Sequence, residues 1–195
     1  MFKRKIEYLL VFFIFTLSFV EINAQNIEKN KSNFQQLISS NDSLVFNEGI
    51  KIINYYAFFK PDSAFKYIDI LIDFARSKHF KKKLAFFYTE KGKIYYFLGF
   101  QTDATYYFSN ALQIFYELND LYNYASLLVR LSKSLFYNID DNSYSFKYIS
   151  EAQDIAKKQK YFDILIKTLI TKSFFYCNSD RSEEHTSELQ SRITI

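Results

Sequence analysis

The chain of 195 residues contains few residues that interrupt or cross-link a backbone: three glycines, one proline and one cysteine. It also contains no tryptophan. A single cysteine, Cys177, excludes an internal disulfide, so packing must supply the stability of the fold. The scarcity of glycine and proline disfavours sheets joined by tight turns and favours long helices.

The sequence also lacks the groups from which active sites are usually built. His79 lies in a lysine-rich stretch without a second histidine or a paired carboxylate, and His185 lies near the C-terminus. Cys177 has no base near it in the sequence, and Asp140 and Asp141 resemble a solvated turn more than a metal site. No phosphate loop, zinc spacing or nucleophile motif is present. We therefore expect no catalysis, no metal and no cofactor.

The balance of charge argues against nucleic acid as a partner. The net charge is only +4, and the basic residues form two short runs, 81–83 and 157–160. Nucleic-acid binding requires a continuous basic surface. We interpret both runs as solvated turns.

Aromatic residues are abundant, with 23 Phe and 17 Tyr, and small or apolar residues recur at steps of 40 and then 41 residues. The three equivalent sets are Ala64, Leu71 and Ala75; Ala104, Ala111 and Phe115; and Ser145, Ala152 and Ala156. Self-similarity at this period is typical of helical hairpins that bury their apolar faces against one another. The pattern predicts an all-α solenoid of antiparallel hairpins, about three and a half repeats long.

Helical periodicity and turn residues predict where the helices lie. The expected helices are 44–58 and 62–77, 83–98 and 103–118, 121–137 and 144–158, and a last helix at 161–176. Asp62, Thr102 and Ser143 stand at equivalent positions before second helices and are expected to be N-caps. The last helix has a broad apolar stripe and no predicted partner, so we expect its stripe to be exposed.

The two ends of the chain differ from its middle. Residues 1–24 have a basic start, an uncharged run and then Ala24, which is typical of a secretory signal peptide and predicts an exported, periplasmic or extracytoplasmic protein. Residues 25–43 are polar and predict a linker with a partial cap, before a repeat domain at 44–180. Residues 181–191 resemble the translation of a sequencing adapter, so we interpret 181–195 as a non-native tail and the repeat domain as truncated.

The middle unit resembles a tetratricopeptide repeat. Aromatic, small and apolar residues stand at the spacing of that family, although Lys91 replaces the usual leucine. The residues that match are Tyr88, Gly92, Tyr95, Gly99, Ala104, Phe108, Ala111 and Leu112. Their packing role extends to Ala64, Ala75, Ala152 and Ala156 in the flanking units.

In this family the first helix of each hairpin lines a concave binding face. The resemblance implies that this face consists of Tyr56, Phe86, Thr89, Lys93, Tyr96, Phe97, Ser126, Val129, Lys133, Phe136 and Tyr137. Lys93 and Lys133 are equivalent and each precedes aromatic residues, so the face would suit an extended peptide with an acidic residue or a C-terminal carboxylate. The alternative is that the aromatic residues pack between helices and the lysines are solvated.

Three functions fit this reading. The first is the sensory or scaffolding part of a bacterial membrane-spanning regulator, whose exported repeats such a chain resembles and whose membrane span and output domain would lie downstream. The second is a free periplasmic or secreted scaffold for other proteins. The third is a carrier of small ligands, which the absence of tryptophan disfavours.

Overall fold

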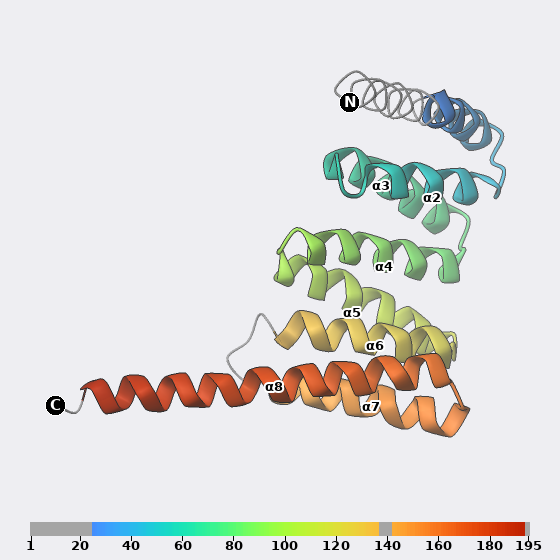
Figure 1. The fold of residues 1–195 in the computed structure, drawn as a ribbon. Coiled ribbons are helices and arrows are strands. Elements are labelled where there is room, and N and C mark those ends of the chain that lie inside the picture. Colours follow the sequence, from blue (N-terminus) through green and yellow to red (C-terminus); the bar gives the residue numbers. More distant parts are fainter. Residues whose placement is uncertain (1–24, 137–141, 194–195) are drawn as a thin grey trace, which may run out of the picture. The chain divides into compact units, whose positions relative to one another are not determined.

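A computed structural model of the protein describes residues 25–136 and 142–193, with side chains described up to Ser179. All regular structure in these ranges is α-helical. After a helix at residues 25–39, the helices are α2 (Val45–Tyr56), α3 (Pro61–Ser77), α4 (Lys81–Phe97), α5 (Gln101–Glu117), α6 (Leu121–Phe136), α7 (Ser143–Gln159) and α8 (Phe162–Ile193). They pack mainly against their sequence neighbours (Figure 1). The all-α class is therefore confirmed, and this packing is consistent with a helical repeat.

The predicted helix limits agree with α2 to α7 to within two residues. The exception is α8, which was expected to end near Tyr176 and instead continues to Ile193. Its backbone thus crosses the predicted boundary at residue 180 without a break. The predicted signal peptide, residues 1–24, lies outside the described residues.

The predicted N-caps are wrong. The helices α3, α5 and α7 are preceded by Lys60, Phe100 and Asn142, and none of these three side chains makes a capping hydrogen bond. Pro61 sets the start of α3, because its fixed φ suits the first helical position. Phe100 is held by a hydrogen bond from its N–H to the Tyr95 carbonyl, so the turn itself starts α5 one residue later.

The chain divides into two compact units, Met1–Lys78 and His79–Ile195, so the boundary falls inside the predicted 44–180 domain. In the first unit α2 packs against α3. The segment expected to be a linker forms the helix at 25–39, which buries Ile27 and Phe34. The Phe34 ring meets the Tyr67 ring edge-on at 5.2 Å. This helix is therefore part of the core of the unit.

In the second unit α4 pairs with α5, α6 pairs with α7, and α5 contacts α6. The helix α8 lies along α7 and also contacts α6 (Figure 1). Across the chain, all nine residues of the 40- and 41-residue pattern are buried, with exposed fractions of 0–4%. The period therefore marks the buried faces of the helices, as the sequence predicted.

The helices α4 and α5 approach each other closely at Gly92. A Cβ atom placed on Gly92 would lie 2.6 Å from two ring carbons of Phe108 and 3.3 Å from the carbonyl oxygen of Ala104. A side chain at Gly92 would therefore collide with the facing helix. The unusual Lys91 is buried in the same hairpin, with its ammonium 4.8 Å from the centre of the Tyr107 ring, which in turn stacks on Tyr95.

Gly99 was predicted to allow close packing of two helices, but it instead allows the backbone to adopt a positive φ after α4. It has a φ of 84°, and no atom lies within 4 Å of the position its Cβ would take. The N–H groups of Gly99 and Phe100 donate to the carbonyls of Tyr96 and Tyr95, which closes α4 in a Schellman motif.

Most other helices end without glycine. The non-glycine residues with positive φ are Asn41, His79, Asn119 and Lys160. The last three follow α3, α5 and α7 at the same steps of 40 and 41 residues. The turn residues after α3, α5 and α7 therefore recur at the same period as the buried residues.

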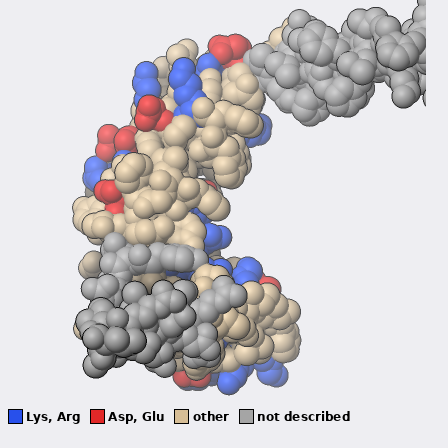
Figure 2. All heavy atoms as spheres, turned by 60° about the vertical axis from the view of Figure 1, so that its left-hand side comes forward, with Lys and Arg blue, Asp and Glu red and all other residues tan. Residues whose placement is uncertain are grey.

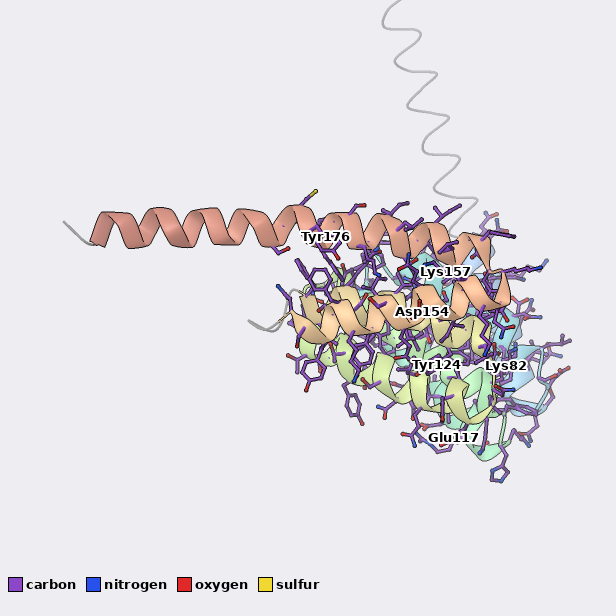
Figure 3. All side chains as sticks on the ribbon, turned by 90° about the horizontal axis from the view of Figure 1, so that it is seen from below. Lys82, Glu117, Tyr124, Asp154, Lys157 and Tyr176 are labelled. Carbon is purple, nitrogen blue, oxygen red and sulfur yellow. The ribbon has the colours of Figure 1, made fainter. Side chains whose placement is uncertain are left out.

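The basic run 81–83 forms the first turn of α4 and not a turn between helices. The Lys82 ammonium lies 2.7 Å from the Asp120 carboxylate and the Lys81 ammonium 3.6 Å from that of Glu117. Figure 3 labels Lys82 and Glu117 among the side chains at these helix ends. On the face shown in Figure 2, acidic and basic side chains are interspersed, without a continuous basic stretch.

The Gly92 contact leads to a stability test. Replacing glycine by alanine inside a helix normally adds about 1 kcal/mol of stability. For Gly92→Ala we expect overpacking against Phe108, which costs about 1–3 kcal/mol, to outweigh that gain and lower the free energy of unfolding in urea. Adding Phe108→Leu should recover part of the loss, because it removes the ring that the new methyl group meets. A Gly92→Ala protein more stable than the wild type would contradict this packing.

Candidate ligand-binding cavity

The second unit contains a cavity of about 420 Å³. Four helices line it: α4 with Lys93, Tyr96 and Phe97; α5 with Phe108; α6 with Ser126, Val129, Arg130 and Lys133; and α8 with Lys167 and Ile170. Its volume lies in the range of pockets that hold small molecules or single side chains of a partner. Apolar and cationic groups converge on it, so it suits a ligand that is both apolar and anionic.

The cavity brings together six of the residues predicted for the concave face. These are Lys93, Tyr96, Phe97, Ser126, Val129 and Lys133. Lys93 and Lys133, which the repeat places at equivalent positions on α4 and α6, therefore line the same space.

The other predicted residues lie elsewhere. Phe86 and Thr89 do not line the cavity; the Phe86 ring meets Phe87, and the Thr89 hydroxyl donates to the Ala85 carbonyl. Phe136 stacks on Phe175 with ring centres 4.3 Å apart, so it packs between α6 and α8.

The structure does not test the last two predicted residues as members of the cavity. Tyr56 belongs to the first unit, where it stacks on Tyr67 and receives the Lys31 ammonium over its ring. Tyr137 lies outside the described residues.

The sequence analysis missed four residues of the cavity. Arg130 precedes Lys133 by three positions on α6, and Lys167 precedes Ile170 by three on α8, so helical spacing could have indicated both pairs. Phe108 was assigned only to packing, although one ring both covers Gly92 and forms part of the cavity wall.

Hydrogen bonds between side chains tie the helices of the second unit to one another. The Ser134 hydroxyl donates to the Gln101 carbonyl at 3.1 Å and lies 2.9 Å from the Thr105 hydroxyl, which ties α6 to α5. The Tyr122 hydroxyl donates to Asp163 at 2.9 Å, which ties α6 to α8. The hydroxyl of Tyr124, which is labelled in Figure 3, donates to Glu151 of α7 at 2.9 Å. Burial and, to a lesser extent, this hydrogen bond raise the pKa of Tyr124.

The four cations of the cavity differ in their partners. Lys93 lies 2.6 Å from the Glu90 carboxylate, and Lys167 lies 3.1 Å from that of Asp163. Within the described part of the chain, Arg130 and Lys133 have no acidic partner. Burial lowers the pKa of Lys133, and the positive charge of Arg130 lowers it further. Arg130 is exposed to solvent and Lys133 is half-buried, so the charge left uncompensated inside the cavity is that of Lys133.

The described ranges contain no cluster of three or more side chains suited to hold a metal ion. They also contain no helix that is both long enough and apolar enough to cross a bilayer.

Comparison with known proteins identifies no family. No family model matches the sequence, and a search of curated proteins finds no match.

The half-buried charge of Lys133 is expected to lower the stability of the unliganded protein. Because the folded state disfavours the charged form of Lys133, we expect Lys133→Met to raise the urea midpoint of the unliganded protein. The matched exchange Lys93→Met removes an ion pair with Glu90 and should not raise it. A lower midpoint for Lys133→Met would show that its charge is compensated in the folded protein.

Proposed function

We propose that the protein is a non-catalytic interaction module that binds an extended segment of a partner protein at the cavity of its second unit. The observation that carries this proposal is the convergence of aromatic, aliphatic and cationic side chains from four helices on one space of about 420 Å³. Such a mixture anchors a partner side chain by apolar contact and orients it by charge.

The finer assignment of the fold belongs to the same proposal. The resemblance to a tetratricopeptide repeat is supported by the burial of the periodic residues and by the close contact at Gly92. In that family, extended peptides bind along the first helices of successive hairpins. Here α4 and α6 hold those positions, and they supply most of the cavity wall.

We consider two proteins in which such a module would occur. In the first it is an exported sensory or scaffolding region of a membrane-spanning signalling or transcriptional regulator, and in the second it is a free periplasmic or secreted scaffold. The reading frame of the gene distinguishes them, because only the regulator requires a membrane span of about 20 apolar residues after the repeats. A small-ligand carrier is the weaker alternative, because the sequence contains no tryptophan on which such a ligand would stack.

A peptide selection tests the binding function. We expect a library of random peptides displayed on phage to yield sequences that bind the wild-type protein. These peptides should lose binding to Ser126→Trp, because the indole fills the cavity, and retain binding to Ser109→Trp, because Ser109 lies on α5 outside the cavity. Circular dichroism checks that both variants stay helical. Failure to select any peptide that Ser126→Trp releases would contradict the proposal.

Export is tested separately. When the full chain is expressed in a Gram-negative bacterium, we expect cleavage after Ala24 and recovery of the shortened protein from the periplasmic fraction. N-terminal sequencing of the product measures both. A product that retains Met1 and stays in the cytoplasmic fraction would contradict the proposed location.

A further inference from the structure

We propose that the cavity and one face of α8 form a single recognition surface for a partner segment that carries a carboxylate beside apolar side chains. In this arrangement Arg130 and Lys133 bind the carboxylate, and α8 binds the apolar side chains. The inference rests on the proposed binding function and assigns the chemistry of its ligand.

The carboxylate is assigned to α6 because of how the cations are paired. Glu90 and Asp163 already neutralise Lys93 and Lys167 at the two sides of the cavity. Arg130 and Lys133 stand one helical turn apart on α6, line the same space and repel each other. A carboxylate placed between them would compensate both charges, with hydrogen bonds that are stronger than neutral ones. Of the two lysines equivalent in the repeat, Lys133 and not Lys93 therefore binds the anion.

The apolar part is assigned to a row of residues on α8, called the α8 strip. These residues are spaced by four, so they share one face of the helix: Phe162, Ile166, Ile170 and Phe174. Their exposed fractions lie between 39% and 67%, although they are large apolar side chains. The inward positions of the same helix, Ile164, Thr168, Thr171 and Phe175, are buried instead.

The α8 strip is continuous with the cavity. Ile170, in the middle of the strip, is also a wall residue of the cavity, and Lys167 lies beside it. Phe174 meets the ring of Phe136 on α6, so the strip borders the helix that carries the unpaired cations. A ligand with its carboxylate at Lys133 would thus extend its neighbouring apolar residues along α8. This geometry favours a protein segment over an isolated small anion.

Defined peptides test the chemistry. The probes are short fluorescent peptides with both ends capped, built from leucine and alanine around one central glutamate. A second probe has glutamine in place of glutamate, a third has serine in place of the leucines, and a fourth has a free C-terminal carboxylate with central glutamine. Fluorescence anisotropy measures the binding of each to the wild-type protein. We expect the glutamine probe and the serine probe each to bind about tenfold more weakly than the glutamate probe. The fourth probe shows whether a chain terminus serves as well as an acidic side chain.

Substitutions in the protein test where the carboxylate and the apolar side chains of the peptide bind. Lys133→Gln should weaken the glutamate probe about tenfold and leave the glutamine probe unchanged. Lys93→Gln, which alters a lysine already paired with Glu90, should weaken the glutamate probe less than Lys133→Gln, and the distant Lys147→Gln should leave both probes unchanged. Ile170→Ser should weaken the glutamate probe but not the serine probe, and Tyr144→Ser, an exposed aromatic on α7, serves as its control. The exposed positions Ile166 and Ile170 allow this exchange without opening the core.

The outcomes separate the two proposals. Equal binding of the glutamate and glutamine probes, or an equal effect of Lys93→Gln and Lys133→Gln, would overturn the assignment of the carboxylate. An unchanged affinity in Ile170→Ser would overturn the role of the α8 strip. In both cases the phage-selected peptides that Ser126→Trp releases would still support the binding function. If neither the selected nor the defined peptides bind, the proposed function itself fails.

Discussion

The structure of the second unit depends on the contact of α4 with α5 at Gly92. Because this residue has no side chain, the Phe108 ring can lie directly over the α4 backbone, and the Ala104 carbonyl can approach it closely. The same ring forms part of the cavity wall between α4, α6 and α8. Packing and candidate function therefore share one side chain, and the cavity exists in its present form because the two helices of one hairpin touch.

A chain with only three glycines must still end its helices. After α3, α5 and α7 the chain turns at His79, Asn119 and Lys160, whose backbones have positive φ. This left-handed conformation is strained for residues with a side chain, and asparagine tolerates it best of the three. Since these residues recur at the repeat period, successive second helices end in the same way and each next helix starts in a comparable register. The left-handed turn residues thus recur at the same period as the buried alanines.

Two lysines at the start of α4 are paired with carboxylates, and so are two of the four cations that line the cavity. Lysines in the first turn of α4 oppose the helix dipole, and Glu117 and Asp120 offset them. Arg130 and Lys133 have no such partner among the described residues, and the exposed α8 strip lies next to them. The half-buried charge of Lys133 and the exposed α8 strip both cost stability in the isolated molecule, and the proposed binding function requires both.

The sequence by itself determined the limits of α2 to α7 and the buried positions of the repeat, because periodicity and residue size act over a few neighbouring residues. It also determined that Lys93 and Lys133 are equivalent, which follows from the repeat alone. Only the tertiary structure decided that Glu90 neutralises Lys93, that α8 brings Lys167 and Ile170 to the cavity, and that the helix at 25–39 buries Phe34. The N-caps and the role of Gly99 were misjudged for the same reason. Ion pairing, cavity walls and turn geometry depend on which atoms of distant segments come within a few ångströms, and no spacing along one chain specifies that.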